Sequence, residues 1–179
     1  MNRLICCLAA CAACLAGAPV RGSVSNSPAS ATLTNRCPEI ELKDQFDTVQ
    51  AIKFPATRPI LLTVADKKGA PGIEGWAHPL GLKFGGRIQI SGLADVSAVP
   101  RPLRGFVQGK FKKAISYPTM LDWEGKICAG FKYEKNQPNI FLVARDGRIL
   151  KHYSGVVDPA HLAELTHAIQ AELDSPPAL

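Results

Sequence analysis

The spacing of polar and apolar side chains predicts strands and helices that alternate along residues 39–173. Glu39–Lys43 alternates polar and apolar positions, and Thr48–Ile52 follows a turn-like segment, so the two predict a hairpin. Ile60–Ala65 is a continuous apolar run, typical of a strand buried on both faces. The remaining pattern predicts, in chain order, a helix over 73–84 kinked at Pro79, a strand over 87–93, a helix over 103–114, a strand end at 120–121, a short helix over 126–133, and strands over 140–144 and 148–153.

The carboxyl-terminal part of this pattern has clear boundary signals. Asp146-Gly147 is a turn pair that accepts positive φ and so predicts a hairpin between the last two strands. Asp158 is a good helix N-cap and is followed by Pro159, which suits the first helical position. The helix after it is expected to reach about Leu173. Strands alternating with helices, closed by an antiparallel hairpin, predict an α/β sheet.

The helix predicted over 103–114 separates two kinds of side chain. Its apolar residues fall on one face, and its lysines are most simply a solvated face. The apolar positions are Leu103, Phe106, Val107, Phe111 and Ala114, and the lysines are Lys110, Lys112 and Lys113.

The first 22 residues predict an export segment. Arg3 precedes the short apolar run Leu4–Ala18, which is the pattern of a signal peptide and too short to span a bilayer. Leu8–Cys11 resembles a bacterial lipobox, and the four residues ending at Cys14 do so more weakly, so a lipid anchor is an alternative to simple cleavage. Residues 23–36 then predict a flexible tether and residues 37–175 one domain, which is expected in the periplasm or anchored to the envelope of a bacterium.

Charge and motif content exclude several function classes. The chain has 21 Lys and Arg against 15 Asp and Glu, and without Arg3 and Arg21 the count is 19 against 15, which is weakly basic. No Lys/Arg cluster suggests nucleic acid, and the four histidines lack metal-ligand spacing. A phosphate-binding glycine loop and a Ser-His-Asp set are also missing, so we expect neither a metal nor a cofactor.

Two segments, together with the order of elements, resemble a known family. The block from Pro138 to Gly147 reads Pro-Asn-Ile-Phe-Leu-Val-Ala-Arg-Asp-Gly, and residues 42–46 read Leu-Lys-Asp-Gln-Phe. Together they resemble thioredoxin-like (redoxin) domains of the peroxiredoxin and TlpA type. Asp146–Ile149 before a capped final helix is also similar to small periplasmic YtfJ-type proteins, which share the fold and lack its cysteines. The resemblance implies an α/β, thioredoxin-like three-layer sandwich with an N-terminal β-hairpin extension.

The chain departs from this family at its redox cysteines. In such domains a Cys-x-x-Cys or a single peroxidatic cysteine follows the first central strand, but residues 38–127 contain no cysteine. A helix-kinking proline follows the second thiol by five residues in thioredoxins. If Pro79 is that proline, Pro71 and Glu74 stand where the thiols would be. Thiol–disulfide exchange by the usual route is then excluded.

The resemblance also implies where a ligand binds. In this family a cis proline faces the active cysteines and offers backbone groups to an extended peptide, and Pro138 occupies the matching place. We therefore expect a cis Gln137–Pro138 bond beside the loop after Ala65, the alternative being an ordinary trans proline. A peptide or protein ligand is expected in a groove near Pro138; simpler interpretations are a solvated turn at 66–68 and an exposed loop histidine. The groove residues are Pro138, Gln137, Asp66, Lys67, Lys68, Trp76 and His78.

Cys37 and Cys128 are the two cysteines beyond the leader, and three interpretations of them stay open. They form a structural disulfide, or a relocated redox pair, or they are unrelated thiols. The first functional hypothesis is a binding or accessory protein of the cell envelope. The alternatives are a thiol-disulfide oxidoreductase or peroxidase that uses Cys128 with Cys37, and a structural envelope protein.

Overall fold

The central sheet is built around the run that the sequence marked as fully buried. The computed structural model describes residues 36–176. Its five-stranded sheet has the order β5-β4-β3-β6-β7, with β3 (Ile60–Ala65) in the middle. All six residues of β3 are buried, because the strand has a neighbour on each side and a packed layer on each face.

The neighbours of β3 run in both directions. β4 (Gln89–Asp95) and β5 (Thr119–Asp122) are parallel to it, whereas β6 (Asn139–Val143) is antiparallel to β3 and to β7 (Ile149–Ser154). The turn between β6 and β7 places Gly147 at φ +92°, as the Asp-Gly pair predicted.

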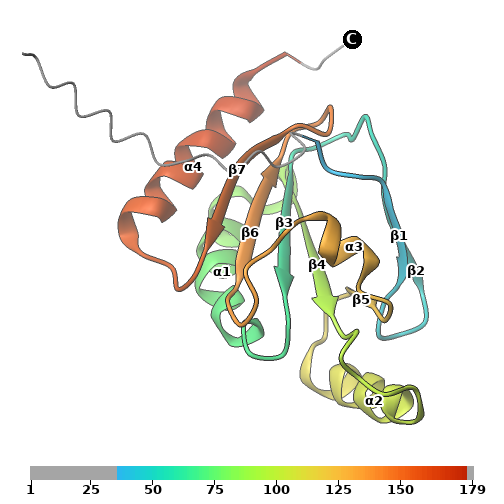
Figure 1. Ribbon diagram of the computed structural model, residues 1–179. Helices are drawn as coiled ribbons and strands as arrows, with labels where there is room; N and C mark the ends of the chain where they lie inside the picture. The colour runs from blue at the N-terminus through green and yellow to red at the C-terminus, as the bar shows by residue number, and fades with distance from the viewer. Residues whose placement is uncertain (1–35, 177–179) are drawn as a thin grey trace, which may run out of the picture. The chain divides into compact units, whose positions relative to one another are not determined.

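Two helices cover one face of the sheet (Figure 1). They are α1 (Ile73–Phe84), preceded by a 3-10 turn over Ala70–Gly72, and α4 (Pro159–Asp174). Asp158 caps α4 as predicted, because its side chain accepts the amide hydrogens of Ala160 and His161. The core on this face joins Leu61, Trp76, Leu80, Phe84, Ile88, Ile140, Leu142, Leu165 and Ile169.

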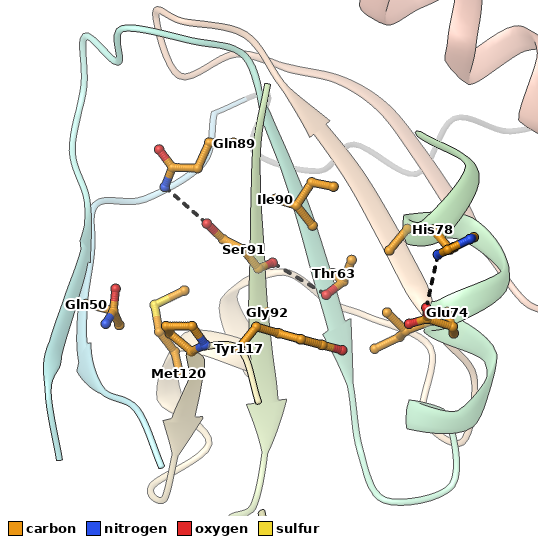
Figure 2. Close-up of a pocket in the computed structure, with 13 residues that line it drawn as sticks. Gln50, Thr63, Glu74, His78, Gln89, Ile90, Ser91, Gly92, Tyr117 and Met120 are labelled. Atoms are coloured by element: carbon orange, nitrogen blue, oxygen red, sulfur yellow. Dashed lines mark hydrogen bonds and ion pairs between the residues drawn. The ribbon is translucent and has the colours of Figure 1, made fainter. Parts of the chain in front are cut away.

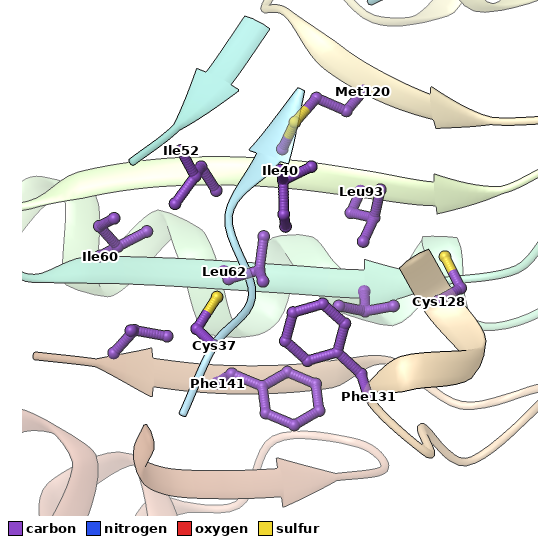
Figure 3. Packing of buried hydrophobic residues seen from close by; sticks show 12 residues of the cluster. Cys37, Ile40, Ile52, Ile60, Leu62, Leu93, Met120, Cys128, Phe131 and Phe141 are labelled. Atoms are coloured by element: carbon purple, nitrogen blue, oxygen red, sulfur yellow. The ribbon is translucent and has the colours of Figure 1, made fainter. Parts of the chain in front are cut away.

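The other face is covered by the hairpin and a short helix. β1 (Ile40–Lys43) and β2 (Val49–Ile52) form the predicted N-terminal hairpin, and α3 is only Lys126–Gly130, shorter than the 126–133 expected. Figure 3 shows the cluster of apolar side chains that these elements bury against the sheet. Helices α1 and α4 form one layer, the sheet the second, and the hairpin with α3 the third. This is the three-layer α/β arrangement that the sequence predicted.

Helix α2 (Arg104–Ala114) belongs to neither layer. A 3-10 turn over Arg101–Leu103 precedes it, and it lies beyond the end of the sheet beside the β1–β2 turn (Figure 1). Gln45 in that turn is fully buried and clamps the segment after α2: its amide nitrogen donates to the carbonyl oxygens of Ile115 and Tyr117, and its oxygen accepts from the amide of Thr119.

Candidate functional site

The loop after the central strand is tied to the loop before β6 by one carboxylate. Asp66 Oδ1 accepts the amide hydrogens of Lys68 at 3.0 Å and Gly69 at 2.9 Å, while its Oδ2 accepts that of Asn136 at 2.8 Å. Asp66 therefore fixes two loops, and the side chains of Lys67 and Lys68 are left exposed.

Two glycines, three residues apart, face Pro138. A Cβ added at Gly69 would overlap the carbonyl oxygen of Gln137, and one added at Gly72 would lie 2.7 Å from Pro138 Cγ. Counting back from Pro79 placed the missing thiols at Pro71 and Glu74, and that placement stays a prediction. The glycines that pack on Gln137 and Pro138 flank and end the 3-10 turn before α1.

The prediction of a cis Pro138 is also wrong. Among residues 36–176 the one cis peptide bond is Phe54–Pro55, so the Gln137–Pro138 bond is trans. Because Gly69 has no side chain, the carbonyl oxygen of Gln137 occupies the space beside it, and trans is the ordinary preference of an X-Pro bond. Pro138 does lie beside the loop after Ala65, as expected, but it is buried there while Gln137 is exposed.

Asn139 is a positioning residue that the sequence analysis missed. It is fully buried, its amide nitrogen donates to the carbonyl oxygens of Glu134 and Gln137, and its oxygen accepts from the amide of Glu134 and contacts His152 Nε2 at 3.1 Å. The available signal was an asparagine between a proline and a buried apolar strand, where a polar side chain needs partners.

Trp76 belongs to the core instead of a groove. It is fully buried and stacks on Tyr153, with ring centroids 5.5 Å apart. Its indole N–H donates to Gly155 O at 3.0 Å, and the amide of Gly155 donates to Pro138 O at 3.0 Å. Sequence reasoning could not decide which way this side chain faces.

The two cysteines are separate free thiols. Both are buried in the cluster of Figure 3, which shows them at different places in it. Burial raises the pKa of the Cys37 thiol to about 12. Burial, then the carboxylates of Asp122 and Asp95, also raises the pKa of Cys128. Of the three interpretations, the structure agrees with unrelated buried thiols, and neither thiol is poised to form a reactive thiolate.

An open cavity of about 450 Å³ lies beside the amino-terminal part of α1, and Pro138 is not among the residues that line it. Figure 2 shows β4 in its middle, β2 with Gln50 on one side, and α1 with Glu74 and His78 on the other. His78 is thus the predicted groove residue that lines this cavity, and its Nδ1 lies 3.6 Å from the Glu74 carboxylate. The full lining is Gln50, Thr63, Ile73, Glu74, Ala77, His78, Gln89, Ile90, Ser91, Gly92, Tyr117, Pro118 and Met120.

The cavity opens on an unpaired strand edge. β4 pairs with β3 from Gln89 to Ala94, but β5 pairs with β4 only along Gly92–Asp95. Pro118 stands just before β5 and has no amide hydrogen to continue that ladder. The first three residues of β4 therefore have no strand on their outer edge within the described part of the chain.

Several uncharged polar groups lie at this edge, beside apolar side chains such as Ile90. Gln89 Nε2 donates to Ser91 Oγ at 3.1 Å, and the buried Thr63 hydroxyl lies 3.4 Å from Ser91 O. Burial, and then the Glu74 carboxylate, raise the pKa of the Tyr117 hydroxyl, so this phenol stays neutral and can donate a hydrogen bond. Among residues 36–176, no group of three or more His, Cys, Asp and Glu side chains could hold a metal ion.

Comparisons with known proteins show the fold. No protein-family model and no curated protein sequence matches the chain. Solved structures do match. A protein from Chlorobium tepidum assigned as the thiol:disulfide interchange protein DsbE has a TM-score of 0.59 at 18% identity and covers 78% of this chain and 96% of its own.

Two further structures agree with it. The exposed lipoprotein thioredoxin Etrx1 of Streptococcus pneumoniae has a TM-score of 0.58 at 10% identity, covering 73% of this chain and 99% of its own. Peroxidoxin BcpB of Mycobacterium tuberculosis has a TM-score of 0.55 at 20% identity, covering 78% and 96%. At these identities the likeness concerns the fold alone, and residues 36–176 adopt the thioredoxin-like fold with an N-terminal hairpin.

Proposed function

We propose that this chain is an exported thioredoxin-fold protein of the bacterial envelope that binds a peptide or protein and performs no thiol chemistry. One observation carries the proposal: the positions that face Pro138 are Gly69 and Gly72, packed so closely that neither has room for a side chain. The buried thiols of Cys37 and Cys128, with their raised pKa values, support it further.

Export is part of the same proposal. It rests on the signal-like residues 1–22, which lie outside the described residues, and is supported by the lipoprotein thioredoxin among the similar structures. No helix of residues 36–176 is long and apolar enough to cross a membrane. Mass spectrometry of the mature amino terminus tests for a lipid anchor. An acyl group on Cys11 or Cys14 marks lipidation, and a first residue beyond Cys14 contradicts it.

The ligand is an extended polypeptide segment that lies along the first residues of β4. This edge offers unpaired backbone groups, and the cavity beside it has room for alternate side chains, which are the two requirements for adding a strand to a sheet. Gln89, Ser91 and Tyr117 supply hydrogen-bonding groups there. On the Pro138 side, where a groove was expected, the available contacts are the exposed side chains of Gln137, Lys67 and Lys68.

A disulfide-reduction assay tests the absence of thiol chemistry. We expect insulin reduction by dithiothreitol to proceed at the uncatalysed rate with the protein present. Alkylation mapped by mass spectrometry should leave Cys37 and Cys128 unmodified in the native protein and modify both in denaturant. Turnover that disappears in Cys128→Ser would instead establish the oxidoreductase or peroxidase that uses Cys128 with Cys37.

A random peptide library displayed on phage tests the binding site. Peptides selected on the wild-type protein should lose binding to Ala77→Leu, which narrows the cavity, and should retain it on Gln137→Ala/Lys68→Ala, which alters the Pro138 side. The reverse pattern would place the ligand beside Pro138. A library that yields no specific binder would contradict peptide binding.

A further inference from the structure

Helix α2 is attached to the domain by polar contacts along one side. Arg104 Nη1 lies 3.0 Å from Glu124 Oε1, Gln108 Nε2 donates to Gln45 O at 3.1 Å, and Lys112 Nζ lies 3.3 Å from an Asp47 carboxylate oxygen. All residues of α2 are described, and none of them is buried. The apolar face predicted for this helix is therefore not a core face.

The opposite side of this helix carries apolar and basic residues in one line. Phe106, Lys110 and Lys113 are spaced by four and three residues, so they share one face of α2, and the N-cap residue Leu103 precedes Phe106 by three. Leu103 is 52% exposed and Phe106 is 66% exposed, and Lys110 Nζ lies 5.3 Å from the Phe106 ring centroid. We call these four residues the α2 stripe.

The charged side chains in the segment that contains the α2 stripe are all positive. Residues 96–121 contain five Lys and Arg and no Asp or Glu. Arg104 and Lys112 have carboxylate partners, whereas Arg101, Lys110 and Lys113 form no salt bridge within the described part of the chain. Interpreting the lysines as a solvated face explains their exposure but leaves Leu103 and Phe106 in water without a reason.

We propose that the α2 stripe docks the domain on an anionic lipid bilayer surface. A bilayer surface is apolar beneath and negatively charged at the headgroups, which suits leucine and phenylalanine next to lysines on one helix face. An acidic protein surface would neutralise the lysines, whereas an anionic bilayer supplies both the negative charge and a continuous apolar layer for Leu103 and Phe106. A helix this short gives weak, reversible binding, which is independent of the ligand site beside β4.

Fluorescence can test whether this helix enters the bilayer. The full chain carrying Phe106→Trp is mixed with vesicles of phosphatidylcholine alone or with phosphatidylglycerol, each containing brominated lipid as quencher. With the anionic vesicles we expect quenching beyond that of the wild-type chain, which already contains Trp76 and Trp123. Leu82→Trp is the matched control, because Leu82 is 76% exposed on α1, and it should show no added quenching. Both variants carry the same residues 1–35, so a difference between Phe106→Trp and Leu82→Trp reports contact at α2 and not attachment through the amino-terminal segment.

Charge reversal tests the lysines. Lys110→Glu/Lys113→Glu should weaken the preference for phosphatidylglycerol over phosphatidylcholine vesicles at least about 30-fold, since each lysine near an anionic surface contributes about 1 kcal/mol. Lys135→Glu/Lys151→Glu, an equal charge change at exposed positions elsewhere, should have a much smaller effect. Equal binding to both vesicle types, unquenched Phe106→Trp, or undiminished binding after reversal of Lys110 and Lys113 would each overturn the proposal.

Discussion

The amino-terminal end of α1 has a closed side and an open side. On the closed side, Gly69 and Gly72 bring the backbone against Gln137 and Pro138, and buried Asn139 holds the facing loop in place. On the open side, the same helix faces a cavity of about 450 Å³ and an unpaired strand edge. The thioredoxin-like fold is thus kept, but backbone atoms fill the space beside Pro138 where a groove was expected. The open cavity lies instead beside β4, the strand next to β3.

A side chain at Gly69 should break the closed side. We expect Gly69→Cys to lower the free energy of unfolding by about 3 kcal/mol or more, because its Cβ would overlap the Gln137 carbonyl and force the loop to move. Urea unfolding measures this effect. Ala77→Leu, which faces the open side, should change the free energy by no more than about 0.5 kcal/mol.

Gly105, which has free space around it, is the control for adding a side chain to a glycine. Nothing lies within 4 Å of a Cβ added at Gly105 in α2, so Gly105→Ala should stabilise the protein slightly, by up to about 1 kcal/mol, through helix propensity. If Gly69→Cys were as stable as the wild type, the closed side would have room for a thiol, and the main support for the proposed function would be lost.

Removing the Gln45 clamp should disturb the open side from a distance. Gln45→Leu leaves the carbonyl oxygens of Ile115 and Tyr117 and the amide of Thr119 without their partner. We expect a loss of about 2–3 kcal/mol, because buried polar groups are left unpaired. Hydrogen exchange should show faster exchange at residues 115–119 with no change around Gly69. Equal changes on both sides would mean that the two sides are not independent.

Much of the fold could be predicted from local patterns. The continuous apolar run of β3, the Asp-Gly turn and the Asp158-Pro159 cap each record a local preference, and each prediction is confirmed. Contacts between segments far apart in the chain have no comparable local pattern in the sequence. The packing of Gly69 on Gln137 and the inward direction of Trp76 depend on how loops far apart in sequence meet.

The cis proline shows how a family expectation fails while its fold is present. Pro138 was expected to be cis because a cis proline accompanies the thiol pair in the family. Here the residues packed on Gln137 and Pro138 are glycines, and with the bond trans the Gln137 carbonyl oxygen lies where a Cβ at Gly69 would be. The cavity was missed for a related reason, since a short β5 after Pro118 reveals an open edge only once its register with β4 is known.

Protonation of His152 in acid should lower the free energy of unfolding by destabilising the closed side. We expect this effect to be the smallest of those predicted here. His152 stacks on Phe141 with ring centroids 4.1 Å apart, and its Nε2 contacts Asn139, which holds the Gln137 carbonyl. Burial lowers the pKa of His152 below its ordinary 6.5, although the nearby Glu134 carboxylate opposes this.

The sign of the pH effect follows from that lowered pKa. The stability due to the neutral ring is complete above pH 6.5 and is lost as the pH falls toward the lower pKa of the folded state, because the unfolded chain takes up the proton first. Urea unfolding of the wild type should therefore show a decline between pH 7.5 and 5.5 that His152→Gln lacks, since glutamine keeps a donor for Asn139 and does not titrate. Parallel pH profiles for the two proteins would show that protonation of His152 has no part in the stability of the closed side.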